Sequence, residues 1–133
     1  KPELEKGTWI ISDRFFDSTK VYQGYARGLN MKMLDEVNRF SCRGVKPDLT
    51  IVLDIPPELG IRRSTGRAAK EEFENDRFDS ETLQFHTAVR DGFLKLAEQD
   101  PERIKIIAAG GTVEEVARAV RECVNHELGL DLL

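Results

Sequence analysis

Three short apolar runs stand out along the chain, each bounded by glycine, proline or charged residues. They cover residues 8–12, 49–55 and 103–109. Short apolar runs with such boundaries are typical of buried strands. The continuous run at 49–55 suits a parallel strand that is covered on both faces. We therefore expect three buried strands.

The segments between and after these runs carry apolar residues at helical spacing, and two of them have a clear apolar stripe. We expect helices over about residues 17–25, 31–42, 57–65, 80–99 and 113–127. Asp17 or Ser18 would cap the first helix and Thr112 the last. The first stripe comprises Met31, Leu34, Val37 and Phe40 (or Cys42), and the second Leu83, Phe85, Val89, Phe93, Leu94 and Leu96.

Strand and helix thus alternate, which predicts a single α/β domain over residues 1–133 with a parallel sheet. Ligands of such sheets bind at the carboxyl ends of the strands. Asp13-Arg14, Asp54 and Gly110-Gly111 all follow predicted strands. We expect a binding site at that edge.

Composition narrows the class of partner. The chain has 20 Lys and Arg against 24 Asp and Glu, a net charge of −4, and so offers no basic surface for nucleic acid or an anionic membrane. No apolar run is long enough to span a bilayer. Cys42 and Cys123 lack metal or redox spacing, and His86 and His126 are isolated, so we expect reduced thiols, no zinc site and a cytoplasmic location.

Asp13-Arg14 is the first group that could do chemistry. A carboxylate at a strand end can hold Mg²⁺ or its water, and a guanidinium can bind phosphate with two hydrogen bonds. The alternative is a surface ion pair at an ordinarily polar strand end. The pair alone does not decide between them.

The helix that follows offers a second group on one side, namely Ser18, Thr19, Tyr22 and Gln23. Tyrosine provides a stacking face, and glutamine can both donate to and accept from a base edge. Alternatively, Ser18 only caps the helix and Tyr22 only packs.

The third group is a charged segment at about residues 64–79 with its preceding turn. Its cations are Arg62, Arg63, Arg67, Lys70 and Arg77. A basic lid that closes over a polyphosphate would have this composition. A solvated helix with i,i+4 ion pairs such as Arg67–Glu71 would have it too. Phe78, next to Arg77, suits either the core or a ring over a ligand.

The order of the motifs is more specific than any one of them. The chain reads DRFFDSTKVYQG, then KPDLTIVLDIPPELGIRR, DRFD, FHTAVRDGFLKLAEQDPERIKII and GGTVEEVARAV. From about residue 2 to 127 it closely resembles bacterial thymidylate kinases. The resemblance implies a P-loop nucleoside-monophosphate kinase fold of three layers. It also implies transfer of the γ-phosphoryl group of ATP to dTMP with Mg²⁺, in a homodimer.

The resemblance also implies roles for single residues on the acceptor side. Asp13-Arg14-Phe15 matches the family's DR-aromatic motif, whose Asp lies by the metal and whose Arg approaches the acceptor phosphate. Ser18, Thr19, Tyr22 and Gln23 match the helix that lines the thymidine pocket. Asp76 and Phe78 fall near the acceptor site.

On the ATP side, Arg63 and Arg67 match lid arginines that reach the phosphates. Thr65 stands where the family carries a further arginine, and Lys70 or Arg77 could replace it. Ala109-Gly110-Gly111 matches the loop beside the adenine.

The sequence contains no G-x-x-x-x-G-K-[ST] loop, which in P-loop enzymes cradles the phosphates of ATP. The resemblance thus implies the carboxyl-terminal two-thirds of a kinase, without its first two strands and an acceptor-side arginine. In the family's strand order, 2-3-1-4-5, the run at 8–12 is third and borders the missing first strand. Three outcomes are open. The run at 8–12 pairs directly with 49–55, another molecule fills the gap in the sheet, or a longer protein supplies the missing strands.

We therefore expect dTMP kinase activity of the intact protein and none of these 133 residues alone. Two alternatives stay open. One is another nucleoside-monophosphate or deoxynucleoside kinase, against which the Tyr22-Gln23 pair argues. The other is a non-catalytic fragment that binds a nucleotide or a partner.

Overall fold

The computed structural model describes residues 2–68 and 83–132 of the chain. It divides into two compact units, Lys1–Pro47 and Asp48–Leu133. We call them the amino-terminal and the carboxyl-terminal unit and describe each by itself.

The amino-terminal unit is built from short helices. These are α1 (Pro2–Glu5), α2 (Phe16–Thr19), the π-helical segment η1 (Lys20–Tyr25) and α3 (Met31–Cys42). Helix α2 begins at Phe16 with Phe15 as its N-cap and no side-chain cap, so the prediction of a cap at Asp17 or Ser18 was wrong. Asp17 is instead buried within the helix.

The predicted strand at residues 8–12 was also wrong. These residues form neither helix nor strand, and the sheet in the described part of the chain contains only β1 and β2. Trp9, Ile10 and Ile11 are 66%, 54% and 98% exposed. A strand exists only where a neighbour satisfies its N–H and C=O groups. The described residues provide no such neighbour, although the sequence of this run favours a strand.

Helix α3 has the predicted bounds of residues 31–42, and only part of the predicted stripe is buried. Leu34 is buried, whereas Val37 and Phe40 are 51% and 87% exposed. The spacing was right about which residues share a face. It does not determine whether another element covers that face.

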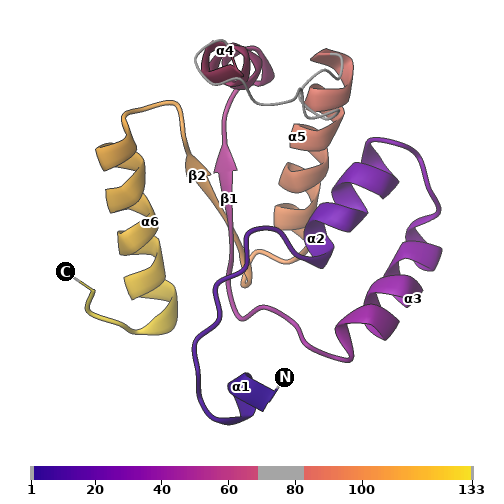
Figure 1. Ribbon diagram of the computed structural model, residues 1–133, viewed down its shortest axis with the longest axis vertical. Coiled ribbons are helices and arrows are strands. Elements are labelled where there is room, and N and C mark those ends of the chain that lie inside the picture. The colour runs from indigo at the N-terminus through magenta and orange to yellow at the C-terminus, as the bar shows by residue number, and fades with distance from the viewer. Residues whose placement is uncertain (1, 69–82, 133) are drawn as a thin grey trace. The chain divides into compact units, whose positions relative to one another are not determined.

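The carboxyl-terminal unit holds a parallel pair of strands, β1 (Thr50–Asp54) and β2 (Ile104–Ala108). Their register places Thr50 beside Ile104 and Asp54 beside Ala108. Its helices are α4 (Pro57–Ala68), α5 (Leu83–Gln99) and α6 (Val113–Leu128). Figure 1 shows α5 and α6 on opposite sides of the strands, with α4 beyond the carboxyl end of β1. The predicted α/β fold with a parallel sheet is therefore confirmed.

The core of this unit lies between the strands and α5. Its buried apolar residues are Val89, Leu96, Ala97, Ile104, Ile107 and Ala109. At the amino-terminal end of the strands, the buried Arg103 donates to Asp100 Oδ2 at 2.8 Å and to Thr50 Oγ1 at 2.7 Å. The strands predicted at 49–55 and 103–109 are confirmed to within a residue at each end.

Helix α6 begins at the predicted cap. The Thr112 hydroxyl accepts from the Glu115 N–H at 3.2 Å, and Glu115 Oε2 accepts from the Thr112 N–H at 2.8 Å. This reciprocal capping box satisfies two amide groups that the first turn leaves without helical partners.

Candidate functional site

The carboxyl ends of β1 and β2 form one polar edge. The Ala109 N–H donates to the carbonyl oxygen of Asp54 at 2.7 Å, so the pairing continues one residue beyond β2. Gly110 and Gly111 then turn the chain into α6, which Thr112 caps. The turn predicted at Gly110-Gly111 is thus held at both sides.

Asp54 at this edge is bound by Arg90 of α5. Arg90 Nε donates to Oδ1 at 2.6 Å and Nη2 to Oδ2 at 2.8 Å. These hydrogen bonds hold the pKa of Asp54 below its ordinary value; burial opposes the shift and the charge of Arg90 adds to it. Hydrogen bonding to Asp54, followed by the attraction of its charge, raises the pKa of Arg90. Both groups therefore stay charged at neutral pH.

Arg63 of α4 binds the loop after β2. Its Nη1 donates to the carbonyl of Ala109 at 2.9 Å, and its Nη2 donates to those of Gly110 and Gly111 at 3.0 Å and 3.5 Å. The family resemblance implied that this side chain reaches the phosphates. In the structure its guanidinium is engaged with backbone carbonyls.

In the amino-terminal unit, Arg14 of the predicted Asp13-Arg14 pair has a left-handed backbone, with φ of 64°. This region is costly for a residue other than glycine, and such strain gathers at binding and active sites. The Ser12 hydroxyl donates to the Arg14 carbonyl at 3.0 Å and so supports the turn. Both Asp13 and Arg14 are exposed.

The Arg14 side chain lies against Tyr22. Its Nη2 donates to the Tyr22 hydroxyl oxygen at 3.3 Å, and its guanidinium carbon lies 5.0 Å from the ring centroid, in cation–π range. The structure thus brings together two predicted site residues from different motifs. Tyr22 orients the guanidinium, which remains exposed.

Tyr22 and Gln23 lie in η1, which sequence analysis expected to be α-helical. The Ala26 N–H donates to the Val21 carbonyl at 2.9 Å, the i→i−5 pattern of a π-helix. Such turns are rare and occur frequently at functional sites. Ser18, Thr19, Tyr22 and Gln23 are all half-buried.

Asp13 is an exposed carboxylate on a loop. Within residues 2–68 and 83–132, no three or more His, Cys, Asp or Glu gather to hold a metal ion. Magnesium in nucleotide enzymes commonly binds one or two carboxylates together with waters and phosphate oxygens. Asp13 fits that mode of binding, in which the nucleotide supplies most of the ligands.

The remaining predicted site residues are not described. Lys70, Asp76, Arg77 and Phe78 lie outside the described residues. The backbone of Arg67 belongs to α4.

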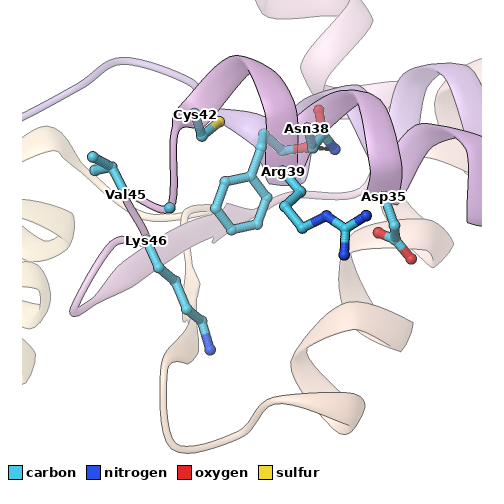
Figure 2. Close-up of a pocket in the computed structure, with 8 residues that line it drawn as sticks. Asp35, Asn38, Arg39, Cys42, Val45 and Lys46 are labelled. Carbon is cyan, nitrogen blue, oxygen red and sulfur yellow. Dashed lines mark hydrogen bonds between the residues drawn. The ribbon is translucent and has the colours of Figure 1, made fainter.

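A separate pocket of about 230 Å³ lies at the end of α3. Its lining residues are Phe16, Asp35, Asn38, Arg39, Cys42, Gly44, Val45 and Lys46. Figure 2 shows the Arg39 side chain extending toward Asp35, with Lys46 on the loop that follows the helix. Asp35 is paired with Lys20 at 2.9 Å. None of the predicted site residues lines this pocket, and its charged groups have both signs.

Comparison with known proteins places the chain in a family. The family model for thymidylate kinase matches residues 1–120. The chain is 49% identical over 122 residues to the thymidylate kinase of Marinomonas sp. and 46% identical over 135 aligned positions to that of Maridesulfovibrio salexigens. These alignments cover 92% and 100% of the chain. They cover 55% and 62% of the relatives.

A solved structure of a thymidylate kinase has a similar fold. The crystal structure of thymidylate kinase from Ehrlichia chaffeensis matches 93% of the chain and 53% of its own length, with a TM-score of 0.67 and 27% identity. The fold is thus that of a nucleoside-monophosphate kinase, with the chain spanning little more than half of that structure. The chain belongs to the thymidylate kinase family.

In the described part of the chain, none of the helices is both long and apolar enough to cross a membrane.

Arg90 was not among the predicted site residues. The available signal was Asp54, an acidic residue at the end of an apolar strand, because a carboxylate that is buried there is stabilised by a cationic partner. Nothing in the spacing identified which arginine provides it.

Proposed function

We propose that the full-length protein transfers the γ-phosphoryl group of ATP to the 5′-phosphate of dTMP and releases dTDP and ADP. The observation that carries the proposal is the exposed Arg14 guanidinium, which a strained turn and the Tyr22 ring hold in place. A preorganised cation of this kind can neutralise the acceptor phosphate as its oxygen attacks the γ-phosphorus atom. Membership of the thymidylate kinase family supports the choice of acceptor.

On the acceptor side, Arg14 binds the phosphate, and the half-buried residues of α2 and η1 bind the nucleoside. Tyr22 presents a ring face and Gln23 an amide that can pair with a pyrimidine edge. Ser18 and Thr19 contribute hydroxyl groups from the preceding turn. We include Asp76 and Phe78 in this side because they follow the family pattern.

Asp13 is the residue that would hold Mg²⁺ or one of its waters. When bound, the ion supplies positive charge to the phosphates. Asp13 itself orients that ligand from the loop next to Arg14.

On the ATP side we place Gly110 and Gly111 with the cations Arg63, Arg67, Lys70 and Arg77. The exposed turn at the carboxyl end of β2 lies where α/β sheets bind ligands. In our proposal the loop that cradles the ATP phosphates lies outside these 133 residues, because the Marinomonas relative is matched over only 55% of its length.

We further propose that the protein works as a cytoplasmic homodimer on free nucleotides. The net charge of −4 supports small nucleotides rather than nucleic acid as its partners.

A panel of acceptors tests the proposal. ADP release by the full-length protein is measured with ATP, Mg²⁺ and each of dTMP, dUMP, dCMP, dAMP, dGMP, AMP and thymidine. We expect the highest kcat/KM with dTMP. A preference for another monophosphate, or for thymidine, would assign the site to a different kinase, and no turnover with any acceptor would favour a binding role.

A further inference from the structure

We propose that Arg63 is a positioning residue that holds the loop of Ala109, Gly110 and Gly111 so that two of its amide N–H groups face a bound purine nucleotide. The inference rests on the proposed function, since it assumes that this loop belongs to the ATP side. It differs from the sequence expectation, in which Arg63 reaches the phosphates directly.

The hydrogen bonds of Arg63 fix the orientation of the loop. One guanidinium binds three successive carbonyl oxygens, at 2.9 Å, 3.0 Å and 3.5 Å. A planar trans peptide directs its N–H opposite to its C=O, and none of the described peptide bonds is cis. The carbonyls of Ala109 and Gly110 point to Arg63, so the N–H groups of Gly110 and Gly111 point away from it.

These two N–H groups are available to a ligand. Both glycines are exposed. No acceptor for either N–H group occurs among the described residues, whereas the flanking Ala109 and Thr112 N–H groups donate to Asp54 O and Glu115 Oε2. Adjacent, unpaired backbone donors form a small site for acceptor atoms. The ring nitrogens of a purine are such acceptors.

Arginine suits this task better than lysine. Its planar fork presents several donors at fixed angles, whereas an ammonium group is a single point of charge on a flexible stem. Lysine at residue 63 should therefore keep part of the contact and alanine none of it.

The test uses the full-length protein and the variants Arg63→Ala and Arg63→Lys. Arg121→Ala is the matched control, because Arg121 is an exposed arginine of α6 outside the charged segment. Two quantities are measured. One is the amide hydrogen exchange of Ala109 and Thr112, whose hydrogen bonds bracket the loop. The other is the Kd for ATP without acceptor.

For Arg63→Ala we expect exchange at both amides to accelerate and the Kd for ATP to rise, each by about tenfold. Arg63→Lys should fall between the parent and Arg63→Ala, and Arg121→Ala should match the parent.

Three results would overturn the inference. If both quantities stay unchanged in Arg63→Ala, Arg63 does not hold the loop. If only exchange changes, the loop does not bind the nucleotide. If only the Kd changes, Arg63 contacts the nucleotide itself. A protein that binds ATP as expected and does not phosphorylate dTMP would refute the proposed function and leave the role of Arg63 standing.

Discussion

Arg90 holds both carboxylate oxygens of Asp54, at 2.6 Å and 2.8 Å, and so joins α5 to the carboxyl end of β1. Asp54 lies beside Ala108 in the sheet, and its carbonyl accepts from the Ala109 N–H. The same residue therefore binds α5 through its side chain and the loop after β2 through its backbone. Because Arg63 of α4 binds that loop as well, this edge is fixed by two helices.

The Asp54–Arg90 pair should make stability depend on pH in the acid range. The pKa of Asp54 in the folded protein lies below its ordinary value of 3.8. Such a group stabilises the fold at pH values above its unfolded pKa, and its contribution is lost as pH falls through the lower, folded value. In urea unfolding of the full-length protein, we expect the Asp54 contribution to be complete above about pH 5 and to decline below about pH 4.

Asp54→Asn should therefore be less stable than the parent at neutral pH and should lose less stability on acidification. Glu98→Gln removes an exposed carboxylate from the same helix as Arg90 and is the matched control. An acid decline of equal size in the parent and in Asp54→Asn would contradict the account of this pair.

Arg14→Gly separates strain from function. Glycine adopts positive φ without the clash that arginine suffers there. The free energy of unfolding should stay within about 1 kcal/mol of the parent or rise. The kcat/KM for dTMP should fall by about two to three orders of magnitude, because a preorganised cation is lost.

Arg43→Gly is the control for Arg14→Gly, since Arg43 is the other non-glycine residue with positive φ in the described part, at 50°. It ends α3, away from the Asp13-Arg14 loop in sequence. It should change stability in the same direction and leave kcat/KM unchanged. Unchanged kcat/KM in Arg14→Gly would remove Arg14 from the mechanism.

Two substitutions at Tyr22 separate its hydroxyl from its ring. Tyr22→Phe removes the oxygen that accepts from Arg14 at 3.3 Å and keeps the ring below the guanidinium. We expect the KM for dTMP to rise by less than about tenfold in Tyr22→Phe. Tyr22→Leu also removes the stacking face and should raise the KM for dTMP by about tenfold or more. Equal effects of the two variants would show that the ring contributes nothing.

The capping box of α6 gives a prediction for stability alone. Thr112→Ala removes the hydroxyl that accepts from the Glu115 N–H. The free energy of unfolding should fall by about 1 kcal/mol, as is typical for loss of an N-cap. Thr112→Ser keeps the hydroxyl and should lose much less. A Thr112→Ser variant as unstable as Thr112→Ala would mean that the methyl group, not the cap, stabilises this turn.

Local signals account for what the sequence predicted correctly. The apolar runs around β1 and β2 are bounded by charge, proline or glycine, and the cap at Thr112 depends on residues only three positions apart. Helix α3 likewise has its N-cap, Asn30, directly before it. Such features need no distant partner.

Two of the wrong predictions concern features that depend on partners. A strand at 8–12 needs a neighbouring strand, and burial of Phe40 needs an element that covers it. The π-helical turn at Tyr22 has no sequence rule as simple as that for an α-helix. The Asp54–Arg90 pair spans 36 positions of sequence, so only the fold determines it.

Transfer of the γ-phosphoryl group from ATP to dTMP is tested by following the transferred group itself. The full-length protein is incubated with Mg²⁺, dTMP and ATP radiolabelled at the γ-phosphate, and the products are separated. We expect label in dTDP, with one ADP formed for each labelled dTDP. Label in inorganic phosphate, or none transferred from ATP, would contradict it.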